Sequence, residues 1–458
     1  MIRLFNVYYS TRTVIRLLGE VPVVAGSFLF AAVYLSGPDP SIPLLYENGL
    51  LKIAMLTVCA VLLTYYFDLY EPQRTSGGWE IYFRILLVLS ALSFALAALL
   101  YWDPAFAFRP NVFVAGILIL AVALILWRAI YEWICSLPVL REKVYVLGRG
   151  ERARAVTELL RIRRDAGMEV IPPESLTISG GENVPPYAAE LHALYTTTAR
   201  VDRVIVAIDD RRGAMPVRDL LELRYKGVFI DDVSTLVERL EGKLLLDGLT
   251  PSTLIFTDGF RIGSLKHLVR RLISFAISLT GLLICLPVIP ILMLAVRLSS
   301  PGPIFFRQTR VGRYGRTFSV FKFRTMRNDA EANGATWATQ NDTRVTRLGK
   351  FMRRTRLDEI PQMWNVLKGD MSFVGPRPER PEFVDWLRKE IPFYELRHMI
   401  RPGITGWAQV RYRYGASLEE TKRKLEYDLY YVKHLSLGLD LLIMFETIKT
   451  ILLQRGSR

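Results

Sequence analysis

The chain has 458 residues, of which 51% are hydrophobic, and it carries a formal net charge of +15. Its mean hydropathy is positive, which argues against an ordinary soluble protein and is expected of a membrane protein. The length allows about three domains. The three cysteines lack the spacing of a metal site and imply no disulfide framework.

The positive charge is concentrated in the C-terminal part of the chain. From Phe256 onward there are 34 Lys and Arg against 18 Asp and Glu, out of 59 and 44 in the whole chain. The first 255 residues are therefore almost neutral. A basic excess of this kind favours an anionic partner, such as a nucleotide, a phosphorylated lipid or a headgroup surface. We expect no nucleic-acid partner.

Four apolar stretches dominate the first 140 residues and predict a bundle of four transmembrane helices. Each has close to the roughly 20 apolar residues that cross a bilayer core. The N-terminus is not expected to be a cleavable signal, because its apolar stretch runs on without a small-residue cleavage site. The predicted helices cover about 14–35, 50–70, 81–101 and 111–133.

The charges flanking these helices predict their orientation. Basic residues precede the first helix and follow the fourth, whereas the first loop, 36–49, has none. This pattern places both ends of the bundle in the cytoplasm. Glu20 lies inside the first helix and could be a functional carboxyl group, but we favour a pair with Arg16, one turn away.

Residues 141–255 read as a cytoplasmic, Rossmann-like α/β domain. The segment 143–171 predicts a strand, a glycine turn, a helix and a second strand, and further strands are expected near 201–208 and 224–230. The turn holding Gly148 and Gly150 matches a dinucleotide-binding pattern, with Glu169 near the distance of a ribose contact.

Two interpretations of this glycine turn stay open. The turn could bind a nicotinamide cofactor, which would make the protein a sugar-nucleotide dehydratase or epimerase. It could instead be a degenerate or regulatory site. We favour the second interpretation, because no oxidoreductase acid–base set such as Tyr-x-x-x-Lys follows the turn.

A fifth apolar segment, about 268–299, predicts a re-entrant membrane helix. Arginines flank both of its ends, which favours two cytoplasmic ends. Pro287 and Pro290 lie in its middle, where proline removes a backbone hydrogen bond and bends a helix. The alternative is a fifth crossing with a kink, which would separate the basic C-terminal region from cytoplasmic nucleotides. A last apolar stretch, 436–453, carries three charges and predicts an interfacial amphipathic helix.

The adjacent carboxylates Asp358 and Glu359 are the strongest candidates for chemistry. Three arginines precede them, and an apolar run with helical spacing follows. We expect Asp358 to be the N-cap of that helix, with Pro361 tolerated in the first turn. Taken alone, acidic residues at a helix start are usually structural. The basic surroundings favour chemistry on a phosphorylated substrate instead.

Four basic residues are candidates for holding the substrate phosphates. Lys322 and Arg324 alternate with Phe321 and Phe323 in a strand-like run, so both cations are expected on one face. Pro376 and Pro378 stiffen the turn around Arg377, and Arg401 stands in a similarly constrained turn. Asp428 lies in an aromatic cluster further along the chain.

From about residue 266 to the C-terminus, the chain resembles the bacterial sugar transferases, which are monotopic polyprenyl-phosphate phosphoglycosyl transferases. The four N-terminal helices and the α/β region resemble the large members of that family, and MIRLFNVYYSTRT resembles an exosortase-linked exopolysaccharide subgroup. The matching segments are SPGPIFFRQTRVG (300–312), FKFRTM (321–326), LDEIPQMWNVLKGDMSFVGPRP (357–378), RPGITGWAQV (401–410) and EYDLYYVKH (426–434).

The resemblance implies a role for each matching residue. Asp358 would attack the sugar-bearing phosphorus of a nucleotide diphosphate sugar, and the aspartyl phosphosugar would pass to undecaprenyl phosphate. Glu359 would bind Mg²⁺. Lys322 and Arg377 match positions near substrate phosphates, and Asp428 matches a required carboxylate. Family members often carry Ser-Pro at the re-entrant break, where this chain has Leu286-Pro287.

The sequence thus predicts an undecaprenyl-phosphate sugar phosphotransferase that initiates exopolysaccharide or other glycoconjugate assembly. We expect three domains: the transmembrane bundle 1–140, the α/β domain 141–255, and a mainly helical α+β catalytic domain 256–458. The protein would be multi-pass in the bacterial inner membrane, with its α/β and catalytic domains in the cytoplasm, and could form homo-oligomers. A non-catalytic scaffold of a polysaccharide assembly complex remains an alternative. The sequence does not name the sugar.

Overall fold

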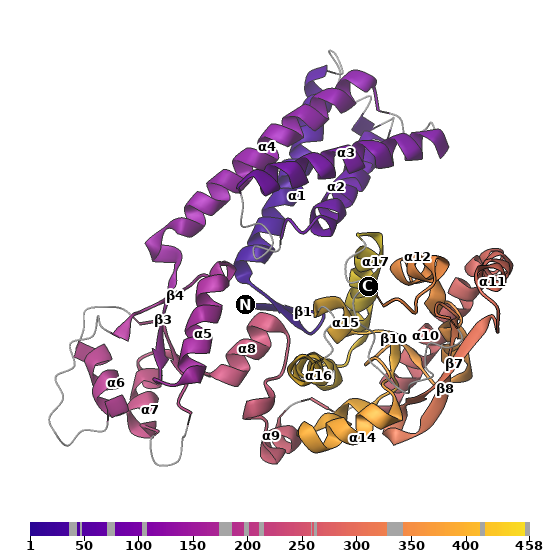
Figure 1. Cartoon of the computed structure of the whole chain (residues 1–458). Helices are drawn as coiled ribbons and strands as arrows, with labels where there is room; N and C mark the ends of the chain where they lie inside the picture. The colour runs from indigo at the N-terminus through magenta and orange to yellow at the C-terminus, as the bar shows by residue number, and fades with distance from the viewer. Residues whose placement is uncertain are drawn as a thin grey trace. The chain divides into compact units, whose positions relative to one another are not determined.

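A computed structural model describes most of the chain (Figure 1). The described residues are 1–35, 44–45, 48–70, 78–102, 108–173, 186–196, 201–209, 215–257, 259–260, 263–327, 342–412 and 417–453. The chain divides into two compact units. Unit 1 contains Tyr9–Leu236, and unit 2 contains Val237–Arg458 together with Arg3–Tyr8.

Unit 1 begins with four long apolar helices (Figure 1), and the helices predicted from the sequence are confirmed. They are α1 (Thr11–Leu35), α2 (Gly49–Tyr66), α3 (Gly78–Trp102) and α4 (Pro110–Ser136). All four are long and apolar enough to cross a membrane. Their shared core contains Phe28, Leu56, Leu92 and Leu120, one from each helix.

The buried carboxylate of Glu20 has a different partner from the one predicted. Arg128 of α4 donates to it at 2.7 Å, and the Tyr70 hydroxyl donates to its other oxygen. Arg16 instead pairs with Glu132 of α4 at 3.1 Å. The expected pair with Arg16 was wrong, because α1 and α4 pack along their length and supply a closer cation across the interface.

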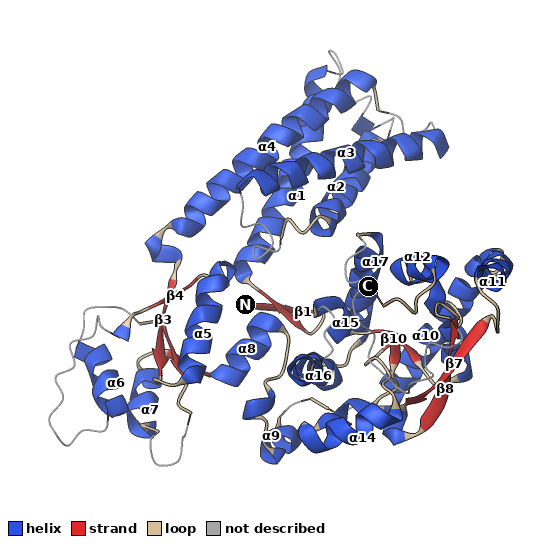
Figure 2. Cartoon of the chain, in the orientation of Figure 1, coloured by secondary structure: helices blue, strands red, loops and turns tan. Residues whose placement is uncertain are grey.

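The rest of unit 1 is built on a four-stranded, fully parallel sheet (Figure 2). Its order is β4-β3-β5-β6, so the glycine turn after β3 lies at the centre of the sheet. Tyr145 and Leu147 pack with α6 and α7, while Val144 and Val146 alternate with them onto the opposite face. The strands are β3 (Glu142–Leu147), β4 (Met168–Val170), β5 (Arg203–Val206) and β6 (Phe229–Asp232), and the helices are α5 (Glu151–Ile162), α6 (Pro186–Thr196), α7 (Val217–Tyr225) and α8 (Val233–Glu241), the last continuing into unit 2.

Unit 2 contains the predicted bent apolar segment as two helices. α10 (Ser264–Cys285) ends just before Leu286-Pro287, and α11 (Val288–Ser299) begins directly after it. The break therefore falls where the sequence placed it. α10 is long and apolar enough to cross a membrane, whereas α11 is shorter. Buried residues of α11 (Leu292 and Val296) pack against the globular part of unit 2.

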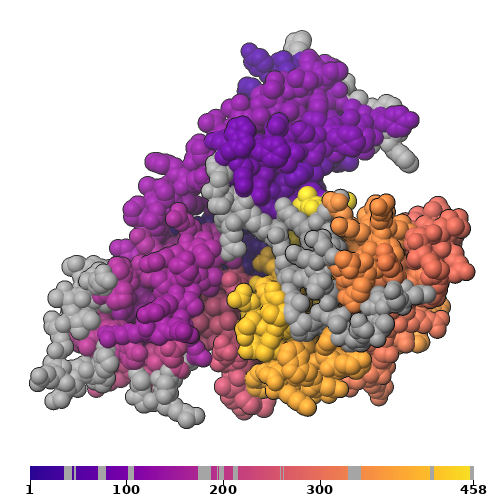
Figure 3. Space-filling model, viewed as in Figure 1, coloured from indigo at the N-terminus to yellow at the C-terminus, as the bar shows by residue number. Residues whose placement is uncertain are grey.

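The globular part of unit 2 combines two small sheets with short helices. β7 (Phe305–Val311) and β8 (Thr317–Phe323) form an antiparallel hairpin, and β9 (Ser372–Val374) pairs in parallel with β10 (Gly403–Thr405). In the space-filling view, the orange surface of α14 borders yellow surface from the C-terminal helices (Figure 3). The helices and helical turns are α9 (Pro251–Phe256), α12 (Arg347–Thr355), η9 (Leu357–Glu359), α13 (Gln362–Lys368), α14 (Pro381–Glu390), η10 (Tyr394–Met399), α15 (Trp407–Arg411), α16 (Leu418–Lys433) and α17 (Leu437–Leu452), with the shorter turns η7 (Leu246–Gly248) and η8 (Arg313–Gly315).

The C-terminal helix α17 turns its charges inward and part of its apolar surface outward. Asp440, Glu446 and Lys449 are buried, whereas Leu441 and Ile448 are more than half exposed. Asp440 pairs with Arg270 of α10 at 2.6 Å. The predicted amphipathic helix is present, but its charges face the protein body and not water, and its position at a membrane surface stays a prediction.

The first residues of the chain fold onto the C-terminal helices of unit 2. β1 (Ile2–Leu4) and β2 (Val7–Tyr9) form a hairpin whose turn residues, Phe5 and Asn6, are left-handed. Arg3 bonds His434 at 3.0 Å, and the Tyr430 hydroxyl donates to the Asn6 carbonyl at 2.8 Å. Residues Arg3–Tyr8, which precede the first apolar helix, are thus part of unit 2.

Candidate active site

Asp358 and Glu359 lie in a tight turn between two helices. α12 ends at Thr355, its C-cap Arg356 is left-handed with a φ of 59°, and the turn η9 then carries both carboxylates. Pro361, not Asp358, stands at the N-cap of α13. The prediction that Asp358 caps the helix was wrong, because the reversal at Arg356 starts a separate turn. The Asp358 side chain is therefore not used for capping.

A buried asparagine fixes this turn against the strand that carries Lys322. The Asn365 amide nitrogen donates to the Ser319 carbonyl at 2.7 Å, and its oxygen accepts from the Phe321 backbone N–H at 3.1 Å. Asn365 is fully buried, so both bonds are shielded from water. This contact holds the start of α13 at a fixed distance from β8.

Glu359 is surrounded by three cations. Lys322 Nζ and an Arg377 guanidinium nitrogen each lie 3.0 Å from its Oε1, and Arg356 lies 3.6 Å from its Oε2. Burial alone would raise the pKa of Glu359, but Lys322, Arg377 and Arg356 hold it well below its usual value. Glu359 is therefore a permanently charged carboxylate within a positive cluster.

Asp358 has a different environment, although it is the next residue. Its side chain is buried, and its Oδ1 has no hydrogen-bond partner among the residues that the structure describes. Burial, followed by the charge of Glu359, raises the pKa of Asp358, while Lys322 and two arginines act in the opposite direction. Buried polar atoms without a hydrogen-bond partner are uncommon, so this oxygen is a candidate for contact with a substrate or an ion.

The four predicted phosphate-binding cations separate into two groups. Lys322 and Arg377 meet at Glu359. Arg324 instead donates to the carbonyls of Ser300 and Pro301, at 2.5 and 3.1 Å, where α11 ends. Arg401 donates to the Gly369 carbonyl at 3.1 Å, at the far end of α13. The structure thus brings two of the four cations to the carboxylate pair.

Arg377 is held in place by its backbone. Gly403 N donates to the Pro376 carbonyl at 2.9 Å, and Gly375 N donates to the Thr405 carbonyl at 2.8 Å. A Cβ on Gly375 would lie 2.8 Å from Gly403 N, so only glycine allows this close approach. The turn around Arg377 is therefore locked to the chain segment that leads into β10.

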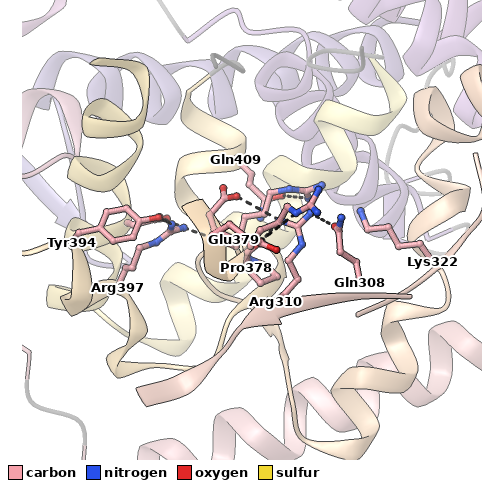
Figure 4. Close-up of polar contacts among 12 residues, drawn as sticks. Gln308, Arg310, Lys322, Pro378, Glu379, Tyr394, Arg397 and Gln409 are labelled. Carbon is pink, nitrogen blue, oxygen red and sulfur yellow. Dashed lines mark hydrogen bonds and ion pairs between the residues drawn. The ribbon is translucent and has the colours of Figure 1, made fainter. Parts of the chain in front are cut away.

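Asp428 lies in a pocket that also reaches Arg377. It is buried on α16 and pairs with Arg397 at 2.8 Å. Arg397 in turn donates to the Arg377 carbonyl at 2.9 Å and to the Tyr394 hydroxyl at 2.7 Å, as Figure 4 shows for Tyr394. Burial raises the pKa of Asp428, although Arg397 opposes the shift. Asp428 thus supports Arg377 through Arg397. The pocket is lined by Arg377, Glu379, Tyr394, Arg397, Ala408, Gln409, Tyr412, Thr421, Lys424, Leu425 and Asp428.

Several residues of this site were not found from the sequence. Figure 4 shows Arg310 of β7 reaching Gln308 and the Pro378–Glu379 turn; its bond to the Pro378 carbonyl is 3.1 Å. Gln409 accepts from Arg377 at 3.4 Å. Arg397 and Asn365 were missed too. Gln308, Arg310, Asn365 and Gln409 all lie within segments that match the family, which was the only signal for them, whereas Arg397 lies outside those segments.

At the glycine turn of unit 1, protein carboxylates lie where an anion would otherwise bind. Gly148 is left-handed, with a φ of +146°, and it joins β3 to α5 as predicted. A Cβ on Gly150 would overlap the Asp209 carboxylate, which lies at the start of α5. Arg149 pairs with Glu190 at 2.7 Å, and Arg152 lies 3.7 Å from Asp209. Carboxylates thus occupy the surroundings where a dinucleotide phosphate would bind.

Glu169, the predicted ribose contact, lies on β4, close to Arg141 at 3.8 Å. Both side chains of this ion pair are partly exposed, so the pair holds the Glu169 carboxylate only weakly. The geometry of the turn therefore gives the nicotinamide interpretation little support.

The sequence predicts that Glu359 binds Mg²⁺, and the donor atoms around the two carboxylates bear on this prediction. Mg²⁺ is usually held by one or two carboxylates together with substrate phosphates. Asp358 Oδ1 is unpartnered among the described residues, but both oxygens of Glu359 already face Lys322, Arg377 or Arg356, so Glu359 would accept Mg²⁺ only once substrate phosphates draw those cations away. Among the described residues, no group of three His, Cys, Asp or Glu could form an all-protein site.

The fold and the site define a membrane protein with a buried carboxylate–cation centre in its C-terminal unit. A family model described as "Bacterial sugar transferase" matches residues 265–454. The chain is 31% identical over 439 residues to the UDP-glucose:undecaprenyl-phosphate glucose-1-phosphate transferase of Escherichia coli K12, covering 92% of each protein. It belongs to the bacterial sugar transferase family and is a transferase enzyme.

Two further relatives match a smaller part of the chain. The UDP-N-acetylgalactosamine-undecaprenyl-phosphate N-acetylgalactosaminephosphotransferase of Aeromonas hydrophila is 42% identical over 265 residues, which are 57% of this chain and 61% of that protein. The exopolysaccharide production protein PSS of Rhizobium leguminosarum is 40% identical over 186 residues, 39% of this chain and 93% of that protein. The relatives' names contain two different sugars.

Proposed function

We propose that the protein transfers a sugar-1-phosphate from a nucleotide diphosphate sugar to undecaprenyl phosphate through a covalent intermediate on Asp358. The observation that carries this proposal is the unequal environment of the two carboxylates. Glu359 is bound by Lys322, Arg377 and Arg356, whereas Asp358 Oδ1 is buried and unpartnered among the described residues. One carboxylate is thus neutralised, and the other is free to react.

The reaction would proceed in two displacements at the same phosphorus. An Asp358 oxygen attacks the sugar-bearing phosphorus, the bond to the bridging oxygen breaks, and the nucleoside monophosphate leaves with the electron pair. An oxygen of undecaprenyl phosphate then attacks that phosphorus, and the Asp358 carboxylate is released. The product is a lipid diphosphate sugar. Two of the relatives are named as transferases between UDP-sugars and undecaprenyl phosphate, which supports this pair of substrates.

The surrounding residues would stabilise the charge that develops on the phosphate oxygens. Lys322 and Arg377 already converge beside the reactive carboxylate, so little reorganisation is needed when the substrate binds. Arg397 and Asp428 would position Arg377 through its backbone carbonyl. Glu359 would hold Mg²⁺ together with the substrate phosphates, once these phosphates draw Lys322 and Arg377 away from it, and the charge of the ion would offset the crowded phosphate oxygens.

The membrane setting fits a lipid acceptor. Unit 2 carries α10 and α11, both with exposed apolar side chains, directly beside the part of the fold that holds η9. We propose that α10 and α11 form a re-entrant hairpin in the bacterial inner membrane, with the site at the cytoplasmic surface. The likeness to an exopolysaccharide production protein supports a role in initiating exopolysaccharide assembly.

A transfer assay tests this function directly. Full-length enzyme would be given radiolabelled UDP-glucose or UDP-N-acetylgalactosamine, undecaprenyl phosphate and Mg²⁺, and the labelled lipid product would be measured. The wild type should form product with at least one of these sugars, and Asp358→Asn should form none. Asp385→Asn, a carboxylate on α14 outside the site, serves as the control and should retain activity. Turnover by Asp358→Asn would overturn the proposal.

Two other functions give different outcomes. A nicotinamide-dependent dehydratase would bind dinucleotide tightly and lose that binding in Gly150→Trp. A non-catalytic scaffold would restore polysaccharide production in a deletion strain even as Asp358→Ala. The carboxylates beside Gly150 argue against the first function, and the membership of a transferase family argues against the second.

A further inference from the structure

A second cationic cluster lies at the beginning of α10, away from the carboxylate pair. His267 and Arg271 stand on the first turns of α10, and Arg401 precedes β10. Among the described residues these side chains line a small pocket together with Arg270, Met371, Ser372 and Ile400. None of these lining residues is acidic.

Arg271 and Arg401 are both oriented by hydrogen bonds to the C-terminal end of α13. Arg271 donates to the carbonyls of Val366 and Leu367, at 2.5 and 2.9 Å, and Arg401 Nε donates to the Gly369 carbonyl at 3.1 Å. These carbonyls end α13, where cations are favourable. The contact uses only one Arg401 nitrogen. Its two terminal nitrogens have no protein partner among the described residues and remain available for a ligand.

The charge of this cluster is not balanced within the described protein. Arg270 is paired with Asp440, whereas Arg271 and Arg401 have no acidic neighbour in the pocket. Burial, followed by Arg313, lowers the pKa of His267, so this side chain is uncharged near neutral pH. Burial, followed by Arg271 and Arg313, lowers the pKa of Arg401. Like charges held together in this way repel, and an anion bound at the mouth of the pocket would relieve the repulsion.

The position of the cluster along α10 indicates where that anion would come from. The same first turns of α10 expose Leu265, Leu268 and Leu272, each by more than half. α10 then continues as an apolar helix long enough to cross a bilayer. Its beginning is therefore expected at the depth of the lipid headgroups, where basic side chains meet phosphates.

The pocket is separate from the reacting centre and too small for a nucleotide. The seven residues of α13, about 10 Å of helix, run from the carboxylate turn to the carbonyls that hold Arg271 and Arg401. The free volume of the pocket is about 20 Å³, enough for one or two water molecules. A whole phosphate, base or sugar does not fit inside this volume, so a bound phosphate would sit at the mouth with its oxygens directed at the arginines.

We propose that His267, Arg271 and Arg401 form a binding site for the phosphate of an anionic membrane phospholipid, which anchors the start of α10 at the headgroup level. The site is distinct from the proposed transfer site and does not depend on that chemistry. A bound phosphodiester would accept from the terminal nitrogens of Arg401 and complete the charge balance of the cluster.

The experiment measures lipid retention by the full-length protein. The protein would be extracted from vesicles of phosphatidylcholine with phosphatidylglycerol, washed in neutral detergent, and examined by native mass spectrometry for bound phosphatidylglycerol. Arg401→Gln should reduce the retained phosphatidylglycerol about fivefold, as expected for one basic residue near an anionic surface. His267→Glu, which places a carboxylate in the pocket without removing a described hydrogen bond, should reduce it at least as much.

Two comparisons make the result decisive. Lys389→Gln removes an exposed cation from α14 and should retain as much phosphatidylglycerol as the wild type. Equal retention by His267→Glu, Arg401→Gln and the wild type would overturn the proposal. In a parallel arm, inorganic phosphate would be added to lipid-free wild type in detergent. Thermal stabilisation by phosphate, with no retained phosphatidylglycerol, would assign the pocket to free phosphate and contradict the lipid site.

Discussion

Unit 1 and unit 2 each contain a turn where arginines and carboxylates gather at the start of a helix, but the balance of charge is opposite. At the start of α5, Arg149 pairs with Glu190, and Arg152 pairs with Asp209. At η9, three cations share Glu359, and Asp358 keeps an unpartnered oxygen within the described residues.

The difference shows what a phosphate site requires. A glycine turn or an acidic helix start supplies the right backbone, and both turns have that. Only the turn of unit 2 has an excess of cations that a phosphate can share. The balance of cations and carboxylates around each turn therefore distinguishes the two, and substitutions that change this balance test the comparison.

Removing a cation from the turn of unit 2 should have the largest effect. Arg377→Ala leaves Glu359 with two cations and deletes a donor that faces the substrate phosphates. We expect the rate of sugar-phosphate transfer to fall by roughly 10²–10³-fold, the usual cost of losing one such donor. Initial rates of lipid product formation measure this, with Lys389→Ala as a surface control. A fall of less than about threefold would place Arg377 outside the chemistry.

Breaking the link between α13 and β8 should destabilise unit 2. Asn365→Ala leaves the buried Ser319 carbonyl and Phe321 N–H without their partner. Each unsatisfied buried group costs about 1–3 kcal/mol, so the thermal unfolding midpoint should fall clearly. The midpoint of the purified enzyme in detergent would be compared with that of Asn365→Asp, which keeps the acceptor. An unchanged midpoint in Asn365→Ala would show that the link contributes nothing.

The pH dependence of transfer should report on Asp358. Its pKa is raised by burial and by Glu359, and only the deprotonated carboxylate can attack. The rate should therefore be lost as the pH falls through a pKa above the ordinary carboxyl value. Lys322→Met removes a cation that lowers this pKa, so the acidic limb of the profile should move to higher pH. Profiles of kcat/KM for both proteins measure the shift, and a limb that moves to lower pH would contradict the assignment.

The smallest effect is expected at the turn of unit 1. Asp209→Asn removes the carboxylate that faces the start of α5, where negative charge is favourable by about 0.3–1 kcal/mol. The thermal midpoint should fall slightly, and transfer should stay within about twofold of the wild type. A loss of transfer comparable to that of Arg377→Ala would mean that the turn of unit 1 takes part in the reaction.

Some features could be predicted from the sequence because they depend on local length or local chemistry. The four N-terminal helices follow from the length of the apolar stretches, and the break at Leu286-Pro287 follows from the proline. The family motifs singled out Lys322, Arg377 and Glu359 as site residues, although not their direct contact. Each of these inferences needs only neighbouring residues or a fixed motif.

The remaining features depend on contacts between distant segments. Arg324 was expected beside Lys322, but β8 ends at Phe323, so the alternation stops and Arg324 turns to the end of α11. The pair of Arg397 with Asp428 joins η10 to α16 and has no local signature. Asp358 does not cap α13 as expected, because the left-handed Arg356 starts the separate turn η9, in which Asp358 lies. Packing decided each of these cases.

The central claim is that Asp358 becomes covalently bound to the sugar phosphate, and intact-mass measurement tests it most directly. Full-length enzyme would be incubated with nucleotide sugar and Mg²⁺ in the absence of undecaprenyl phosphate, quenched in acid and weighed. We predict a gain equal to one sugar phosphate in the wild type, its disappearance when undecaprenyl phosphate is added, and no gain in Asp358→Asn. A wild type that turns over substrate without any adduct, or an adduct in Asp358→Asn, would contradict the claim.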